Sequence, residues 1–361
     1  MVAFCDWRSH LRLVRRKPLC DVAFITNMRD GVDRKIFLGA WQPRAGHFNG
    51  PRYWLNGIGG RTRSLDSLAH DLLTSHGRKK ARGQFISAVG WAQDSGAKII
   101  LLAAGTKRLF GSDGQRIKEL FPDLIFTIGD NGTMVILLQE TLQALQHSNL
   151  KPGKARIGVL GPYGFLGETM VKALTDRGFE VIGAGPNNGG LTKVASKYDI
   201  TVCQSFSEIG KVDAVIACTH SDKIRLNTSS IDMIRPHQKK LLVIDVAEPS
   251  NLTKAEFVNC QDRVIRLDSG NAYSPNLKYV LGAISYRMFR LTRGVTFGCF
   301  AETLSLAAAI SCGDGDIAGI NWFDVNEENM RIISCLFEQN GFTAPNPRNF
   351  GREIRSFCLH R

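Results

Sequence analysis

Short apolar runs alternate with stretches of helical periodicity along the first part of the chain, and this alternation predicts an α/β fold. Apolar runs bounded by charged or small residues are typical of buried strands, whereas apolar residues spaced three and four apart form one face of a helix. Strands are expected at residues 22–25, 98–103 and 124–127. Helices are expected at residues 65–75, 84–93 and 115–120, and a loop rich in Gly, Pro and Asn at residues 43–60.

The alternation becomes more regular after residue 155. Most apolar runs there are followed by an amphipathic stretch, which is typical of β–α–β units joined into a parallel sheet. Strands are expected at residues 156–160, 180–183, 201–204, 214–218, 240–246 and 263–267. A doubly wound sheet of this kind binds its ligands at the carboxyl ends of the strands.

Residues 129–150 predict a long helix between the two series, with Asn131 or Thr133 as its cap. We therefore predict a two-lobed α/β protein. An N-terminal α/β substrate lobe with the connecting helix is expected at residues 1–150, and a C-terminal Rossmann-type lobe with a doubly wound parallel sheet at residues 151–296. Two apolar helices within residues 297–361 are expected to close the cleft between the lobes.

A glycine turn follows the first expected strand of the second lobe. Gly161, Gly164 and Gly167 form a GxxGxxG pattern, in which glycine allows a tight turn and the close approach of a phosphate to the backbone. The helix start adds free N–H groups and a partial positive charge. The pattern indicates a dinucleotide site, and a turn that only lets strand and helix pack together is the alternative.

The loop after the next strand bears on which dinucleotide is bound. Residues 183–190 contain no Asp or Glu to accept a hydrogen bond from a ribose 2′-hydroxyl, and Lys193 and Lys197 follow, so NADPH is favoured over NADH. His220 ends another strand, where it could line the nicotinamide pocket or hydrogen-bond a loop. The expected cofactor-binding residues are Gly161, Tyr163, Gly164, Phe165, Leu166, Gly167, Asn187, Asn188, Thr219 and His220.

Composition restricts the class of protein further. The chain has 361 residues, of which 43% are apolar, and no apolar run is long enough to span a membrane. Nine dispersed cysteines without a CxxC pair, and a first segment without the features of a secretory signal, indicate a reducing, cytoplasmic setting. No cluster of Cys and His has the spacing of a metal site, so no metal is expected.

The formal net charge of +13 comes from 46 Lys and Arg against 33 Asp and Glu, with basic runs at residues 8–17 and 78–82. Such runs fit an acidic partner, such as an acidic protein or acyl carrier or a polyanionic cofactor, or they form a solvated surface. Nucleic acid is disfavoured, because no aromatic residues interleave with the basic runs and no nucleic-acid motif accompanies them.

Cys299 is the candidate nucleophile. It follows Gly298 and opens an apolar helix, where free N–H groups are expected to lower the pKa of the thiol and favour the thiolate. Glu302, one helical turn later, could influence that proton or complement the helix dipole. Taken alone, a cysteine in an apolar helix is more often a buried structural residue.

A resemblance to a known family changes this weighing. Residues 297–304, FGCFAETL, resemble the cysteine motif of the aldehyde-forming long-chain acyl-(acyl-carrier-protein) reductases, and other stretches follow that family's order along the chain. These stretches are KIILLAAGTKRLFG at 98–111, FTIGDNGTMVILLQ at 126–139, IGVLGPYGFLG at 157–167, LLVIDVAEPSNL at 241–252 and residues 328–342, which end in NGF.

The resemblance implies that Cys299 takes the acyl group from a thioester of an acidic acyl carrier protein or of CoA. It implies that NADPH then reduces the enzyme thioester and that an aldehyde leaves, a reaction of fatty acid metabolism. The family's nucleotide glycines fall on Gly161, Gly164 and Gly167. The turn is bulkier than the family's, with Pro162, Tyr163 and Phe165, which leaves the affinity and orientation of the cofactor open. The N-terminal segment is shorter than the family's, which leaves the carrier-docking surface, the acyl pocket and the acyl substrate open.

Asn131 and Thr133 are expected in the substrate cleft, where shikimate-dehydrogenase-like folds bring the interdomain helix. Lys107 follows the end of an expected strand and is placed in the same cleft, where it could face an anionic substrate. Helix caps and a solvated loop are the alternative roles. Two other functions stay open. One is direct reduction of a small carbonyl in the manner of shikimate-dehydrogenase-like enzymes, without need of Cys299. The other is a non-catalytic nucleotide-binding protein whose basic surface binds an acidic partner.

Overall fold

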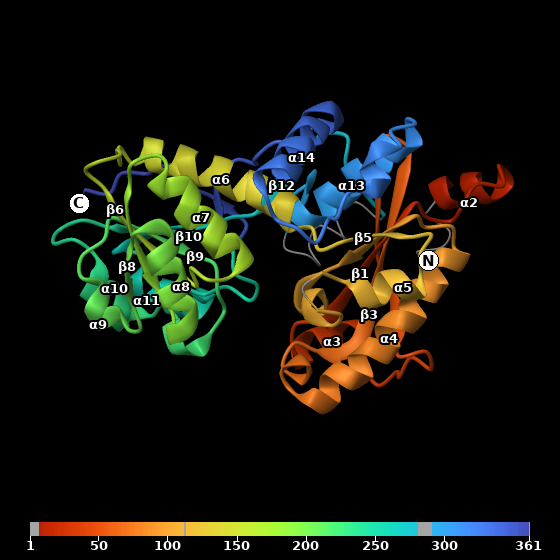
Figure 1. Ribbon diagram of the computed structural model, residues 1–361, viewed down its shortest axis with the longest axis horizontal. Coiled ribbons are helices and arrows are strands. Elements are labelled where there is room, and N and C mark those ends of the chain that lie inside the picture. The colour runs from red at the N-terminus through yellow and green to blue at the C-terminus, as the bar shows by residue number, and fades with distance from the viewer. Residues whose placement is uncertain (1–6, 112, 281–290, 361) are drawn as a thin grey trace. The chain divides into compact units, whose positions relative to one another are not determined.

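The computed structural model describes residues 7–111, 113–280 and 291–360. The chain forms two compact units, which we describe separately. Unit 1 comprises Met1–Thr133 and Ala272–Thr343, and unit 2 comprises Met134–Asn271 and Ala344–Arg361. Unit 1 thus joins the N-terminal elements, drawn red to yellow in Figure 1, to the blue helices near the end of the chain.

Unit 1 is built on a six-stranded sheet with the order β13-β2-β3-β1-β4-β5. The four strands β3, β1, β4 and β5 run parallel, whereas β2 and β13 are antiparallel to their neighbours. The strands are β1 (Val22–Met28), β2 (His47–Leu55), β3 (Ile58–Leu68), β4 (Ile99–Leu102), β5 (Ile125–Thr127) and β13 (Lys278–Tyr279). A small ribbon pairs β12 (Asn271–Tyr273) with β14 (Val295–Phe297).

Six α-helices and three short 3-10 turns accompany this sheet among the described residues. The helices are α2 (Trp7–Val14), α3 (Gly31–Phe37), α4 (Ser75–Asp94), α5 (Gln115–Leu120), α13 (Gly298–Ser311) and α14 (Glu327–Asn340). The 3-10 turns are η1 (Asp71–Leu73), η2 (Ala104–Arg108) and η4 (Asp316–Gly319).

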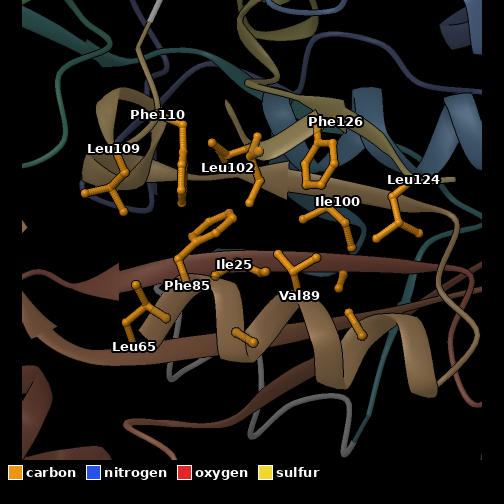
Figure 2. Close-up of a cluster of buried hydrophobic side chains, with 14 of the residues drawn as sticks. Ile25, Leu65, Phe85, Val89, Ile100, Leu102, Leu109, Phe110, Leu124 and Phe126 are labelled. Carbon is orange, nitrogen blue, oxygen red and sulfur yellow. The ribbon is translucent and has the colours of Figure 1, made fainter. Parts of the chain in front are cut away.

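The two faces of this sheet are covered by different helices. Alternate side chains of a strand point to opposite faces. Ile25 of β1 belongs to a buried cluster with Phe85 and Val89 of α4, as Figure 2 shows. Its neighbour Phe24 instead stacks on Phe300 of α13, with ring centroids 4.2 Å apart. Helix α13 therefore packs on the opposite face from α4, and this stacking fixes the position of the first turn of α13.

The hairpin formed by β2 and β3 differs from the sequence prediction. We expected a loop at residues 43–60 and a helix at 65–75, but these stretches form the hairpin and η1. The hairpin turns at Asn56 and Gly57, both with positive φ, which is the signature of a tight two-residue β-turn. Leu65 lies on β3 and is fully buried, so the apolar residues at 65–68 belong to a strand and not to a helix.

Unit 2 is built on a six-stranded, fully parallel sheet with the order β11-β10-β9-β6-β7-β8. The strands are β6 (Arg156–Leu160), β7 (Glu180–Ala184), β8 (Thr201–Cys203), β9 (Ala214–Ala217), β10 (Leu241–Asp245) and β11 (Val264–Asp268). The helices are α6 (Asp130–His147), which begins in unit 1, α7 (Phe165–Thr175), α8 (Asn188–Tyr198), α9 (Phe206–Ile209), α10 (Thr228–Ile234) and α11 (Lys254–Cys260). The turn η3 (Asp222–Ile224) and the ribbon of β15 (Arg348–Asn349) and β16 (Arg352–Glu353) complete the elements.

Numbered from β6, this sheet has the strand order 3-2-1-4-5-6 of the Rossmann fold. The order reverses between β6 and β9, and such a switch point is where doubly wound sheets bind nucleotides. The predicted fold class, a two-lobed α/β protein with a C-terminal Rossmann-type sheet, is therefore confirmed. All six predicted strands of this sheet lie within a residue or so of the observed ones.

The compact units do not coincide with the predicted ranges 1–150, 151–296 and 297–361. Most of α6 belongs to unit 2, where the buried Glu140 carboxylate accepts a hydrogen bond of 2.7 Å from the Gly270 N–H group. The last residues also return to unit 2, where the Gly351 N–H group donates to Asp268 and the guanidinium of Arg266 lies over the Phe350 ring. The role of the C-terminal helices at a cleft between lobes stays a prediction.

Candidate functional site

Cys299 lies in the first turn of α13, directly against the start of α6. Glycines make this contact possible. A Cβ atom on Gly129 would come within 2.2 Å of the Cβ atom of Cys299, and one on Gly298 would come within 2.7 Å of the Cα atom of Thr133. The two helix starts therefore meet backbone to backbone, and any larger residue at Gly129 or Gly298 would force them apart.

Glu302 joins the two helices next to this contact. It is fully buried, and one carboxylate oxygen accepts a hydrogen bond of 2.6 Å from the Gly132 N–H group at the start of α6. The other oxygen accepts a hydrogen bond from the hydroxyl group of Thr127. Burial raises the pKa of Glu302 to about 7, although these two hydrogen bonds act in the opposite direction. A carboxylate of α13 thus caps α6 and exchanges its proton near neutral pH.

Lys107 supplies the positive charge of the site. It belongs to η2, which follows β4, and its ammonium forms an ion pair with Asp130, the first residue of α6. Burial alone would lower the pKa of Lys107, but Asp130 and the other acidic groups nearby outweigh burial and raise it. Lys107 is therefore held as the ammonium ion beside Cys299.

The thiol of Cys299 does not have the lowered pKa that its place at a helix start led us to expect. Burial raises its pKa to about 11, Lys107 lowers it, and Asp130 and Glu302 raise it further. The N–H groups of one helix turn are not enough to offset burial and two carboxylates. The resting thiol is protonated at neutral pH, so a nucleophilic role requires that its proton be removed.

Asn131 and Thr133 lie in the first turn of α6, close to Cys299, but neither caps the helix as predicted, because the helix already begins at Asp130. The Thr133 hydroxyl donates to the Gly129 carbonyl oxygen at 3.0 Å. The Asn131 amide donates to the Asp324 carbonyl oxygen, also at 3.0 Å. The Oδ1 atom of Asn131 is buried and has no hydrogen-bond partner among the described residues, which leaves an acceptor at the site.

The glycine turn of unit 2 lies at the switch point between β6 and β9. Gly161 has φ of 77°, and a Cβ atom there would come within 2.8 Å of the Thr219 Cβ atom at the end of β9. A Cβ atom on Gly167 would come within 2.1 Å of the Gly161 carbonyl oxygen. The turn itself needs these two glycines. Gly164 differs, because it has ordinary extended dihedral angles and only one atom within 4 Å of its would-be Cβ atom.

The open space beside Gly164 leaves room for a ligand to approach the backbone. Gly164 directly precedes α7, whose first N–H groups have no partner within the helix. This is the arrangement that binds a pyrophosphate. The residues present therefore fit a dinucleotide, held by the turn from Gly161 to Gly167 and the first turn of α7.

Replacing Gly164 with valine is expected to weaken NADPH binding by at least about tenfold, because the side chain would occupy the space of the pyrophosphate. Fluorescence titration with NADPH measures this. Gly31→Val is the matched control, since Gly31 also opens onto free space at the start of a helix, in unit 1. Unchanged affinity in Gly164→Val would show that the pyrophosphate does not lie at this turn.

Tyr163 explains how a bulky residue fits in the turn. Its ring covers the β7–α8 loop and the first turn of α8, where a Cβ atom on Gly185 or Gly190, respectively, would come within 2.7 or 2.8 Å of it. Its hydroxyl accepts a hydrogen bond of 3.3 Å from the Asn187 N–H group. Asn187 in turn caps α8 by accepting from the Gly190 N–H group at 3.1 Å. The turn and the loop are thus one packed unit, and the glycines of the loop make room for Tyr163.

A pocket of about 600 Å³ opens beside this loop. Its walls include Tyr163 and Asn187, two of the predicted cofactor-binding residues, together with Lys193 and Lys197. The wall also contains Glu168 of α7, which the sequence pattern did not single out and which pairs with Lys197 at 2.8 Å. With two lysines and one glutamate, the pocket wall carries more positive than negative charge.

Two of the other predicted cofactor residues, Thr219 and Asn188, form hydrogen bonds within unit 2. The Thr219 carbonyl oxygen accepts a hydrogen bond of 2.7 Å from Asn251, and the Thr219 hydroxyl accepts from Ser221. Asn188 accepts from the Gln204 amide at 3.3 Å. His220 follows β9 and is exposed, as Phe165 is at the start of α7. Contacts of these side chains with a dinucleotide stay predictions.

Residues 156–249, from β6 through β10, match the model of a protein family described as NADP oxidoreductase, coenzyme F420-dependent. The matched stretch contains the glycine turn, the β7–α8 loop and the lysine-lined pocket. It supports the expectation, drawn from the sequence, that unit 2 binds NADPH. The match covers about a quarter of the chain and does not extend to unit 1. A search of curated protein sequences found no match.

Several solved structures have partial similarity to this chain. L-tryptophan dehydrogenase from Nostoc punctiforme is 11% identical over 89% of this chain and 88% of its own, with a TM-score of 0.40. The A chain of dipicolinate synthase from Bacillus subtilis is 15% identical over 46% of this chain and 56% of its own, with a TM-score of 0.33. The nucleotide-binding domain of glutamyl-tRNA reductase from Thermoplasma volcanium is 20% identical over 36% and 84%, with a TM-score of 0.28. Because these TM-scores are below 0.5, the likenesses indicate neither a substrate nor a reaction for this chain.

Proposed function

We propose that the protein reduces an acyl thioester to an aldehyde with NADPH, through a thioacyl intermediate on Cys299. The observation that carries this proposal is the cluster of ionisable groups around one thiol in unit 1: Cys299, Lys107, Asp130 and Glu302. Burying charged groups costs free energy, and strongly shifted pKa values gather at functional sites. An apolar helix with a purely structural cysteine would have no need of them.

The roles of these residues follow from their charges. The Cys299 thiol gives up its proton as its sulfur attacks the thioester carbonyl carbon, and Lys107 stabilises the negative charge on the sulfur. Glu302, with a pKa near neutral, is the group that can hold the proton. The carbon–sulfur bond to the carrier or CoA breaks, and the departing thiol takes up a proton. The acyl group is now bound to Cys299.

The turn from Gly161 to Gly167 would hold NADPH, which would supply the hydride that reduces the carbonyl carbon of the enzyme thioester. The carbon–sulfur bond to Cys299 then breaks, and an aldehyde is released. Cys299 leaves as a thiolate, which Lys107 again stabilises before the sulfur is reprotonated. The positive charge beside the sulfur thus serves both attack and departure.

The preference for NADPH over NADH is a separate prediction about the pocket in unit 2. The double variant Lys193→Ala/Lys197→Ala is expected to bind NADPH about ten- to a hundredfold more weakly, because charged hydrogen bonds to the 2′-phosphate are lost. Affinity for NADH is expected to stay the same, and it serves as the internal control. Equal loss for both nucleotides, or tighter binding of NADH by the unaltered protein, would contradict the assignment of NADPH.

The proposal as a whole is tested by intact-mass spectrometry after incubation with a panel of acyl-CoA and acyl-carrier-protein thioesters without NADPH. A mass increase equal to one acyl group is expected for at least one member of the panel, and the member that reacts identifies the substrate class. Preference for the carrier-bound chain would fit the basic net charge of +13, since acyl carrier proteins are acidic. Absence of any adduct across the panel would contradict the proposal.

A second candidate function is direct reduction of a small carbonyl, and the ion pair of Lys107 and Asp130 favours it. An ammonium held by a carboxylate can donate a proton to the oxygen of a carbonyl as hydride arrives at its carbon. The raised pKa of Cys299 fits this function as well, since the thiol would then have no chemical part. The two functions differ in whether Cys299 is needed.

A further inference from the structure

Helix α2 is attached to unit 1 through its polar side. Arg12 is buried, pairs with Asp21, and donates to the carbonyl oxygens of Pro18 and Gly57 at 3.0 and 2.9 Å. Ser9, on the same side of the helix, is buried as well, and its hydroxyl accepts a hydrogen bond of 3.1 Å from Arg61. Contacts of an arginine and a serine therefore hold α2 on unit 1.

The opposite side of α2 carries an apolar stripe, Trp7, Leu11 and Val14. The spacing i, i+4, i+7 places these three side chains on one face, and 100° per residue puts that face roughly opposite Ser9 and Arg12. Their exposed fractions are 58%, 37% and 82%. An amphipathic helix of a globular protein ordinarily turns its apolar face to the core, so α2 is mounted the other way round. It lies at the periphery of unit 1, drawn red in Figure 1.

A basic cluster flanks this stripe: Arg8, Arg15, Arg16 and Lys17. The guanidinium of Arg8 lies over the Trp7 ring at 4.6 Å, and the other three residues are exposed. Residues 7–20 contain no Asp or Glu. Asp6 directly precedes Trp7 in the sequence, and the next acid along the chain, Asp21, is already held by Arg12 and by the Gly59 N–H group. The surface therefore combines exposed apolar side chains, including a tryptophan, with an excess of positive over negative charge.

We propose that α2 binds the surface of an anionic phospholipid bilayer. The apolar stripe would enter the boundary between headgroups and acyl chains, where tryptophan is favoured, and the basic cluster would meet the lipid phosphates. Among the described residues, no helix has the length and apolar character to cross a bilayer, so this binding would be peripheral. An acidic protein would satisfy the charges but gives no reason for the outward-facing stripe. The inference does not depend on the chemistry at Cys299.

Co-sedimentation of the full chain with vesicles tests this surface. Vesicles of equal parts phosphatidylcholine and phosphatidylglycerol are compared with vesicles of phosphatidylcholine alone, at low and high salt. We expect binding to the anionic vesicles only, and weaker binding at high salt because exposed charges are screened. The triple variant Trp7→Gln/Leu11→Gln/Val14→Gln is expected to bind at least about tenfold more weakly, since the buried apolar area is lost.

The matched control is the triple variant Val32→Gln/Ile36→Gln/Trp41→Gln, which removes equally exposed apolar side chains elsewhere in unit 1 and should bind as the unaltered protein does. Three results would overturn the proposal. The first is no binding to either vesicle. The second is equal binding by the stripe variant and the unaltered protein, which would leave only charge and favour an acidic protein partner. The third is a dimer in sedimentation velocity that the stripe variant abolishes, which would make a second copy of the chain the occupant.

Discussion

The variant Cys299→Ala is expected to form no acyl adduct and to produce aldehyde at least about a thousandfold more slowly than the unaltered protein, because the thioacyl intermediate cannot form. NADPH binding should persist, since the glycine turn belongs to unit 2 and Cys299 to unit 1. Cys299→Ser should be nearly as inactive, because a serine hydroxyl is a poorer nucleophile. Aldehyde measured by gas chromatography, alongside NADPH oxidation, gives the rates.

The control for this variant is Cys335→Ala, which removes an exposed thiol from another helix of unit 1 and should leave the rate unchanged. The free energy of unfolding of Cys299→Ala should fall by on the order of 1 kcal/mol, as for truncation of a small buried side chain. Loss of activity in this variant would therefore not reflect unfolding. A fully active Cys299→Ala protein would exclude the thioester mechanism and leave direct carbonyl reduction through Lys107.

The variant Lys107→Met is expected to have the second-largest effect, a loss of acylation rate of about a hundredfold, as for removal of one preorganised charge at a developing anion. Lys107 lowers the pKa of the Cys299 thiol, so its removal should raise that pKa further and slow attack at any given pH. Alkylation of Cys299 by iodoacetamide, followed at the peptide level as a function of pH, measures the thiolate directly. Lys107→Arg keeps the charge and is the control.

Glu302→Gln should move the same alkylation rate in the opposite direction. The Glu302 carboxylate raises the pKa of Cys299, so a neutral amide should lower that pKa and speed alkylation at neutral pH. The glutamine can still accept the Gly132 N–H group, so the cap of α6 is retained. Alkylation rates that do not change in either variant would show that these residues serve only the structure.

The Rossmann sheet of unit 2 could be predicted from the sequence because most of its strands are short apolar runs followed by a helix. The β2–β3 hairpin of unit 1 was missed although its signal is local. Leu55 and Ile58 flank an Asn–Gly pair, a strong hairpin signature, but Gly and Pro elsewhere in residues 43–60 favoured a loop. The prediction of a helix at residues 65–75 was wrong, because Leu65 is a buried residue of strand β3.

Single residues of the candidate site could be predicted from the sequence, but the contacts between them could not. Cys299 and Lys107 carry chemistry that a motif can indicate, but the ion pair of Lys107 with Asp130 and the cap that Glu302 provides for α6 join residues far apart in the chain. The predicted direction of the Cys299 pKa shift was wrong for the same reason. A helix start is visible in a sequence, whereas burial and neighbouring carboxylates are properties of the folded chain.

The reaction of the acylated protein with NADPH tests the central claim most directly. The protein is acylated with the thioester that gives the adduct, freed of excess substrate, mixed with NADPH and quenched for peptide mass spectrometry. We predict the acyl group on the Cys299 peptide, its disappearance on addition of NADPH, and an equal amount of aldehyde. An acyl group on a different residue, or one that stays on Cys299 while NADPH is oxidised, would contradict reduction of a Cys299 thioester.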